Sequence, residues 1–179
     1  YKVAVFDKDK LVEVRTYHDL TVSTLNAAFL SFDIKKSIFC SVGGRENTEI
    51  LNFLKENSEF VFMTEQLALP VRIAYKTPSS LGKDRVASVV GASQIVEGKP
   101  VLVIDAGSCI CFDYIDKNAV YHGGSIAPGF EMKYKALHNF TADLPLLNLK
   151  SEDVGLCGQS TDMCMHSGVI NGTLCEIRG

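Results

Sequence analysis

The sequence predicts an α/β fold in which mixed sheets are flanked by helices. Short apolar runs rich in β-branched residues, which are typical of strands, alternate with longer segments whose apolar residues recur at helical spacing. The order of elements also repeats, because a meander of strands followed by helices occurs in each half of the chain. This weak duplication indicates two lobes, at 1–98 and 99–179, with the boundary at Lys99-Pro100.

The first half of the chain begins with a predicted hairpin. Two apolar runs, at 3–6 and 11–17, flank a polar turn. Asp19 is a suitable N-cap for a helix whose apolar residues extend to Phe29. The next elements are one helix around 50–54 and three strands, at 36–42, 59–63 and 71–75.

The second half of the chain repeats this order. A helix is predicted from about Asp84, because the residues after it are apolar at helical spacing as far as Ile95. The short apolar run at 101–104 indicates a buried strand. It is followed by a returning strand at 109–115, a third strand at 119–126, a helix at 130–140 and a helix that contains Thr161.

The composition argues against two classes of partner. The chain has 179 residues, 46% of them hydrophobic and 22% charged, which is enough for a substantial core. Its formal net charge of -3 offers no electrostatic footprint for DNA or RNA. No apolar run is long enough to cross a membrane. We therefore predict that the protein binds neither nucleic acid nor a membrane.

The six cysteines do not have the spacing of a metal site. None of them forms the paired Cys-x-x-Cys pattern that is typical of zinc binding. Small buried thiols in a reducing compartment account for them better than disulfides do, so we predict a cytoplasmic protein. The four histidines do not cluster in the sequence and are assigned no chemistry.

The segment 77–85 carries the strongest chemical signal. A proline and a glycine punctuate a loop that ends in Asp84 and Arg85, at or next to the start of a helix. The backbone N–H groups and the macrodipole at a helix start keep a carboxylate ionised. Such a carboxylate can accept a proton from an alcohol while the arginine binds an anionic substrate. The alternative is an ordinary N-cap followed by a surface arginine, because aspartate is a favoured cap.

A second signal lies where the strand at 101–104 ends. Asp105 reaches a turn there, and an alanine, Gly107 and Ser108 precede the returning strand. The backbone N–H groups of such a turn can bind phosphate, and the Ser108 hydroxyl adds a further donor. Asp105 could hold a cation that neutralises this phosphate. Alone the pattern is weak, since most turns of this kind are only hairpins.

Together with two later elements, these segments resemble the type III pantothenate kinases, which belong to the actin-like, sugar-kinase-like ATPase superfamily. The segment 77–85 matches their substrate motif Thr-Pro-x-x-Leu-Gly-x-Asp-Arg, and 105–108 stands where the family has Asp-Ala-Gly-Thr. The third element is Gly-Gly-Ser-Ile-Ala-Pro-Gly at 123–129, and the fourth is Gly-Gln-Ser-Thr at 158–161. Four motifs in the expected order over almost the whole chain make the resemblance specific.

The resemblance implies a fold of two ribonuclease-H-like lobes and the ATP-dependent phosphorylation of pantothenate to 4'-phosphopantothenate, the first step of coenzyme A biosynthesis. Asp84 would be the catalytic base. Alternatives stay open at two positions, because Tyr75 could be a core residue and Thr161 could be the N-cap of its helix. The residues that would bind pantothenate are Asp84 itself together with Tyr75, Gly82, Lys83, Arg85 and Thr161.

The resemblance also implies the cofactors ATP, Mg2+ and a monovalent cation, K+ or NH4+. Gly107 and Ser108 would bind the nucleotide phosphates, together with Lys2, which falls where the opening phosphate motif of the family ends. Asp105 would be the ligand of the monovalent cation, with a turn aspartate as the alternative. Members of the family act as dimers, so a homodimer is expected from the resemblance.

The family has further segments at both ends, an opening strand with Asp-x-Gly-Asn-Thr and a Gly-rich segment after the last helix. We expect that the sequence omits these ends; if the protein truly lacks them, ATP turnover should fail. Two other functions remain open, a non-catalytic regulatory or accessory protein of the same fold and another small-molecule kinase or phosphatase of the superfamily. The intact Gly-x-Asp-Arg argues against an inactive kinase.

Overall fold

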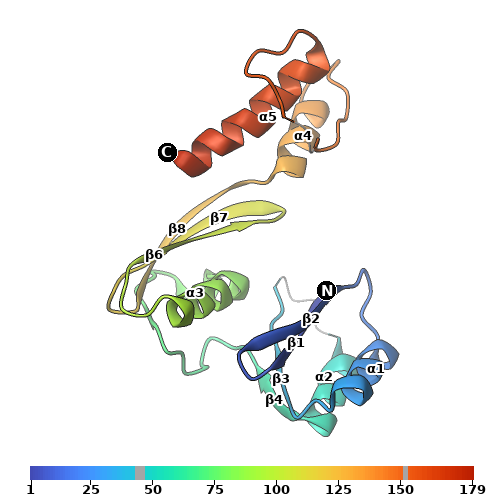
Figure 1. The fold of residues 1–179 in the computed structure, drawn as a ribbon, viewed down its shortest axis with the longest axis vertical. Helices are drawn as coiled ribbons and strands as arrows, with labels where there is room; N and C mark the ends of the chain where they lie inside the picture. The colour runs from blue at the N-terminus through green and yellow to red at the C-terminus, as the bar shows by residue number, and fades with distance from the viewer. Residues whose placement is uncertain (43–46, 151–152) are drawn as a thin grey trace. The chain divides into compact units, whose positions relative to one another are not determined.

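The computed structural model is a mixed α/β structure, which confirms the predicted fold class (Figure 1). It describes residues 1–42, 47–150 and 153–179. The strands form small sheets, one of which combines parallel and antiparallel pairs. The finer expectation of two ribonuclease-H-like lobes stays a prediction.

The described chain forms two compact units. Unit 1 contains Tyr1–Ala68 together with Gly82–Asp84, and unit 2 contains Leu69–Leu81 together with Arg85–Gly179. Both units include strands and helices, so each can bury an apolar face of its own. The lobe boundary expected between 98 and 99 stays a prediction.

Unit 1 contains two small sheets. The hairpin predicted at the start of the chain is confirmed as β1 (Lys2–Asp7) paired antiparallel with β2 (Lys10–Thr16). The second sheet is a parallel pair, β3 (Lys36–Phe39) and β4 (Glu59–Phe62). β3 ends three residues before the predicted position 42, because the ladder with β4 ends at the pair of Phe39 and Phe62.

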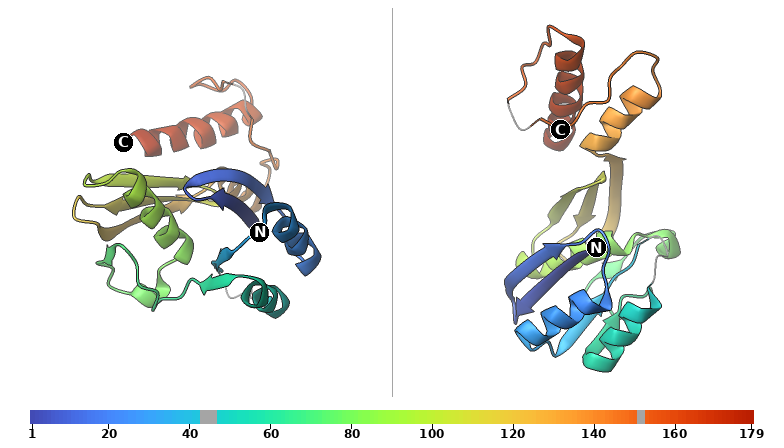
Figure 2. Two further views of the ribbon diagram at one scale, coloured as in Figure 1. Left: turned by 60° about the horizontal axis from the view of Figure 1, so that its bottom comes forward. Right: turned by 90° about the vertical axis from the view of Figure 1, so that its right-hand side faces the viewer.

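Two helices of unit 1 build its core. Helices α1 (Val22–Phe32) and α2 (Thr48–Asn57) lie side by side (Figure 2). Asp19 was expected to cap α1, but the cap is Thr21, whose hydroxyl accepts from the backbone N–H of Thr24 at 3.2 Å. Apolar side chains of the two helices, and one from the segment before α1, form a buried cluster. Its members are Leu20, Leu25, Ile50 and Leu54.

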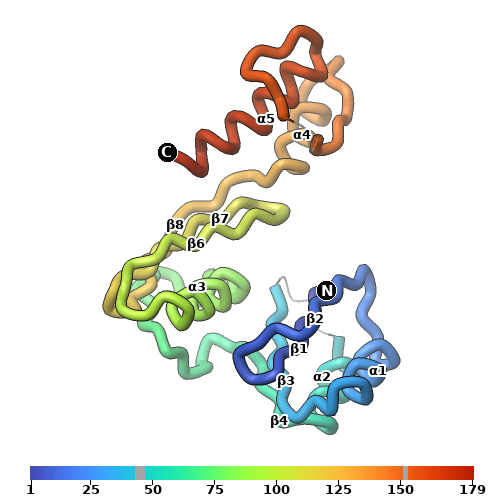
Figure 3. Tube along the Cα trace, viewed as in Figure 1, coloured from blue at the N-terminus to red at the C-terminus, as the bar shows by residue number. Residues whose placement is uncertain are grey.

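Unit 2 is built on a four-stranded sheet in the order β5-β8-β7-β6. The strands β6 (Val101–Ala106), β7 (Cys109–Ile115) and β8 (Val120–Pro128) form the antiparallel meander that the sequence predicts, and the trace in Figure 3 follows it. The predicted strand at 71–75 is reduced to β5 (Arg72–Ile73), which pairs in parallel with β8.

Two further helices of unit 2 pack against each other. Helices α4 (Phe130–Asn139) and α5 (Thr161–Arg178) lie side by side. Between them the Tyr134 hydroxyl and His166 Nδ1 form a buried hydrogen bond of 2.7 Å. Lys133 Nζ also donates to Thr173 Oγ1 at 2.8 Å. None of the helices in the described ranges is long and apolar enough to cross a membrane.

The cysteines differ from the expectation of buried thiols. All six are free, but four of them are exposed and Cys109 and Cys111 are only partly buried. Cys40 and Cys157 lie in loops, and Cys164 and Cys175 lie on the last helix of the chain. The prediction that the cysteines are buried is therefore wrong. The four exposed cysteines are Cys40, Cys157, Cys164 and Cys175.

Candidate active site

The motif at 77–85 folds into a short turn followed by a helix. A single 3-10 turn at Pro78–Ser80 leads through Gly82 into α3 (Lys83–Ile95). Asp84 lies in the first turn of α3 and is exposed, which confirms its predicted position at a helix start. Because α3 begins at Lys83, Asp84 lies inside the helix and is not its N-cap. The capping interpretation of Asp84 is therefore wrong.

Within unit 1, Lys83 and Asp84 lie near the carboxyl ends of the parallel strands. Lys83 Nζ is 5.4 Å from the centroid of the ring of Phe62, the last residue of β4. Cys40 follows β3. Partial desolvation of its thiol, and then the negative charge of Asp84, raise the pKa of Cys40, and the positive charge of Lys83 lowers it. The carboxyl ends of parallel strands are where α/β proteins commonly bind ligands. Asp84 is thus an exposed carboxylate near the carboxyl ends of β3 and β4, where a ligand could bind.

Arg85, the next residue along α3, is buried in unit 2. Its side chain is 8% exposed, and it forms a two-pronged ion pair with Asp113 of β7. Arg85 Nε donates to both carboxylate oxygens at 3.1 Å, and Nη2 donates to Oδ1 at 2.5 Å. The hydrogen bonds to Asp113 raise the pKa of Arg85 further above its usual range. The alternative of a surface arginine is therefore wrong.

Asp113 also binds a tyrosine. The Tyr121 hydroxyl donates to Asp113 Oδ1 at 2.6 Å, and both side chains are buried. The sequence reasoning assigned Asp113 no role, although one signal was present. A carboxylate inside the otherwise uncharged run Cys-Ile-Cys-Phe-Asp-Tyr-Ile requires a partner if the strand is buried.

The shifted pKa of Tyr121 makes the free energy of unfolding depend on pH in the alkaline range. Burial, followed by the hydrogen bond to Asp113, raises the pKa of Tyr121 above the unfolded value of 10.0. The neutral phenol is therefore favoured in the folded state, so its contribution is complete below about pH 10 and is lost as the pH rises above it. We expect the free energy of unfolding, measured with urea, to fall between about pH 9 and about pH 11, and to fall less in Tyr121→Phe. An equal fall in both proteins would contradict this assignment.

Tyr75 follows β5 and lies against the same cluster. Its ring stacks on the ring of Tyr121, with centroids 6.4 Å apart and planes inclined by 2°. Gly123 of β8 makes this position possible, because a Cβ there would lie 3.0 Å from the Tyr75 ring and because its φ of +93° disfavours other residues. Tyr75 is only partly buried, so part of its surface stays accessible to a ligand.

The predicted phosphate turn joins β6 and β7. Asp105 is exposed near the end of β6, and the Gly107 N–H donates to the Cys109 carbonyl at 2.9 Å. The Gly129 N–H, at the N-cap of α4, donates to the Ser108 carbonyl at 3.0 Å. A Cβ on Gly129 would lie 2.3 Å from the Gly107 carbonyl oxygen, so the turn packs directly against the start of α4.

This turn has donors suited to a phosphate. The exposed Ser108 hydroxyl lies in the turn, and the adjacent start of α4 carries backbone N–H groups and the positive end of the helix dipole. The Asp105 carboxylate is an oxygen ligand of the kind that hard cations prefer. In the described part of the chain, no group of three or more His, Cys, Asp or Glu side chains could hold a metal ion. The Gly107 and Gly129 N–H groups already donate to carbonyl oxygens, so the groups that fit a phosphate are the Ser108 hydroxyl and the first turn of α4. Asp105 supplies one carboxylate for a cation.

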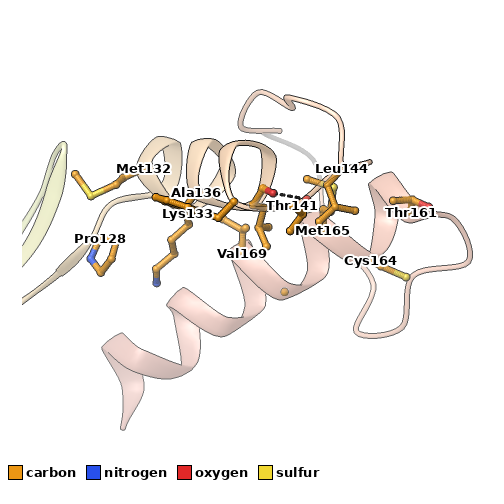
Figure 4. Close-up of a pocket in the computed structure, with 13 residues that line it drawn as sticks. Pro128, Met132, Lys133, Ala136, Thr141, Leu144, Thr161, Cys164, Met165 and Val169 are labelled. Carbon is orange, nitrogen blue, oxygen red and sulfur yellow. Dashed lines mark hydrogen bonds between the residues drawn. The ribbon is translucent and has the colours of Figure 1, made fainter.

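Thr161 begins α5 and lies at one end of an apolar pocket (Figure 4). The pocket has a volume of about 950 Å³ and is lined by Pro128 at the end of β8, by α4 and α5, and by the chain that follows α4. The cap of α5 is Ser160, whose hydroxyl accepts from the Met163 N–H at 3.3 Å. The alternative that Thr161 is the N-cap is therefore wrong.

The structure groups some of the predicted site residues and places others apart. Tyr75 and Arg85 meet at the Asp113–Tyr121 pair of unit 2. Lys2 is exposed on β1 of unit 1, where it pairs with Thr16. The remaining residues lie in three other places. Gly82, Lys83 and Asp84 lie at the start of α3, Asp105, Gly107 and Ser108 lie on the β6–β7 hairpin, and Thr161 lies on α5. Their roles in binding and catalysis stay predictions.

Comparison with known proteins shows one family. The family model for type III pantothenate kinase matches residues 1–179. A type III pantothenate kinase from Phocaeicola vulgatus is 39% identical over 178 residues, which cover 99% of this chain and 73% of that protein. One from Christiangramia forsetii is 40% identical over 180 residues, with the same coverage of both chains.

A solved structure shows the same fold. It comes from Campylobacter jejuni, is described as that of a Baf family transcriptional activator, and superposes with a TM-score of 0.52 at 24% sequence identity. The match covers 86% of this chain and 67% of that one. At this identity the likeness bears on the fold alone. The family model over the whole sequence and the relatives near 40% identity lead to the conclusion that the chain belongs to the type III pantothenate kinase family.

Proposed function

We propose that the protein transfers the γ-phosphoryl group of ATP to the primary hydroxyl of pantothenate. The observation that carries this proposal is the exposed carboxylate of Asp84 in the first turn of α3, followed directly by an arginine that a buried partner fixes in place. Family membership supplies the substrate class, since type III pantothenate kinase is the family that matches the whole sequence.

The proposed roles rest on the resemblance to the family and on the chemistry of each side chain. Asp84 orients the pantothenate hydroxyl and accepts its proton, while Arg85 and Tyr75 bind the rest of the substrate. Phosphoryl transfer depends mainly on positioning and on neutralising charge, which such residues can provide. The β6–β7 turn at Gly107 and Ser108 binds the nucleotide phosphates, and Lys2 contributes a positive charge. When bound, Mg2+ and a monovalent cation neutralise phosphate charge.

Three further parts of the proposal come from the family. Gly82 and Lys83 line the pantothenate site beside Asp84, and Thr161 contacts the substrate from α5. The protein acts as a homodimer in the cytoplasm. Light scattering of the purified protein tests the dimer, and a monomer under assay conditions would contradict it.

A coupled assay of ADP release tests the proposed function. Turnover that requires pantothenate supports it. Turnover with a sugar in place of pantothenate would favour another kinase of the superfamily, and the absence of turnover by the complete protein would favour a regulatory role.

The cation assignment gives a separate prediction. If Asp105 binds K+ or NH4+, Asp105→Ala should weaken the dependence of kcat on potassium, because the exposed carboxylate provides a hard oxygen ligand. Rates are measured in potassium buffer and in sodium buffer of equal ionic strength. Glu131→Ala, which removes an exposed carboxylate from the first turn of α4, is the matched control. Equal wild-type rates in the two buffers would contradict the assignment.

A further inference from the structure

One buried carboxylate links two of the predicted pantothenate contacts. Asp113 accepts hydrogen bonds from Arg85 and from Tyr121, and Tyr121 stacks on Tyr75. We propose that Asp113 is a positioning residue of the pantothenate site, which fixes the Arg85 guanidinium directly and the Tyr75 ring through Tyr121. This inference rests on the proposed function, because it concerns how the same site binds the same substrate.

Asp113 fixes the orientation of the Arg85 guanidinium. The bonds from Nε and Nη2 hold one edge of the planar group against the carboxylate, so both its position and its plane are set. Asp113 is 1% exposed and Arg85 is 7% exposed, so water does not compete freely for either group. An arginine that is ordered before the substrate arrives loses less side-chain entropy on binding.

Asp113 fixes Tyr75 in two steps. The hydrogen bond from its hydroxyl orients Tyr121, whose fully buried ring then forms the parallel surface on which Tyr75 lies. A Cβ on Gly123 would lie 3.0 Å from the Tyr75 ring, so the space beside the ring on β8 is too small for a side chain there. Loss of the Asp113 carboxylate would loosen Tyr121 and, through it, Tyr75.

The contacts of Asp113 also indicate that it acts through other residues. An ionised carboxylate accepts hydrogen bonds and donates none. Arg85 Nε shares its one N–H between the two oxygens of Asp113, and Arg85 Nη2 and the Tyr121 hydroxyl both donate to Oδ1, so three donors of the fold converge on a carboxylate that is 1% exposed. Its expected effect is therefore on the affinity for pantothenate rather than on the chemical step itself.

Steady-state kinetics of Asp113→Asn and Tyr121→Phe in the complete protein test this role. Asp113→Asn keeps the shape of the side chain but removes its charge, so the KM for pantothenate should rise about tenfold while the KM for ATP stays within about twofold. Tyr121→Phe keeps the stacked ring and removes only the hydroxyl, so its KM for pantothenate should rise about threefold. Calorimetric titration with pantothenate alone should show the same order of affinities.

Ile110→Val is the matched control. Ile110 is buried in the same strand but pairs with Ala106 and Ala127 and not with a member of the cluster, so this variant should lower the melting temperature and leave the KM for pantothenate unchanged. A folded Asp113→Asn protein with the wild-type KM for pantothenate would overturn the positioning role alone. If Asp113→Asn does not fold, the test rests on Tyr121→Phe. A wild-type KM for pantothenate in Tyr121→Phe would then overturn the positioning role. A wild-type protein that neither binds nor phosphorylates pantothenate would overturn both this role and the proposed function.

Discussion

Asp84→Asn is expected to lower the kcat for pantothenate phosphorylation by about 10²-fold or more, because the amide cannot accept the hydroxyl proton. The free energy of unfolding should change by only about 1 kcal/mol or less, since the Asp84 side chain is exposed at the start of α3. The ADP-release assay gives the rate, and urea denaturation gives the stability. Activity is expressed per folded molecule, so that the two effects are separated.

Glu49→Gln is the matched control for this variant. Glu49 is also an exposed carboxylate in the first turn of a helix, α2, so its replacement removes the same favourable interaction with a helix dipole. The control should keep the wild-type kcat. If Asp84→Asn unfolds the protein while activity per folded molecule is unchanged, Asp84 has a structural role and the catalytic assignment fails.

Asp113→Ala is expected to lower the free energy of unfolding by about 3–5 kcal/mol, because it leaves a buried guanidinium without its counter-charge. The Arg85–Asp113 pair is nearly inaccessible to water, with side chains 8% and 2% exposed. Replacing both residues together, as Arg85→Met with Asp113→Leu, should restore much of the loss, since apolar side chains carry no desolvation cost. Urea denaturation of Arg85→Met, of Asp113→Leu and of the double variant measures the coupling between the two residues.

An exposed ion pair provides the comparison. Glu131 and Lys135 are one turn apart on α4, with 3.6 Å between the charged atoms and both side chains largely exposed. Glu131→Ala should change the free energy of unfolding by only about 0.5 kcal/mol or less. An equally small change in Asp113→Ala would show that the buried pair does not stabilise the fold.

The order of elements could be predicted from the sequence because it depends on local patterns. The hairpin of β1 and β2, the meander of β6, β7 and β8, and the helix start beside Asp84 follow from runs and periods of apolar residues. Helix caps were less reliable, since several polar residues precede α1 and α5 and the choice among them depends on backbone geometry. Thr21 and Ser160 are the caps, where Asp19 and Thr161 had been considered.

The α/β class, the order of the strands and helices, and the motifs of the family could all be predicted from local patterns in the sequence. The partners and the burial of the site residues, in contrast, depend on contacts between distant parts of the chain. Arg85 and Asp113 are 28 residues apart, and nothing local indicates that they form a pair. The pairing arises because α3 and β7 each bury one charged group, and a charge removed from water requires an opposite charge beside it.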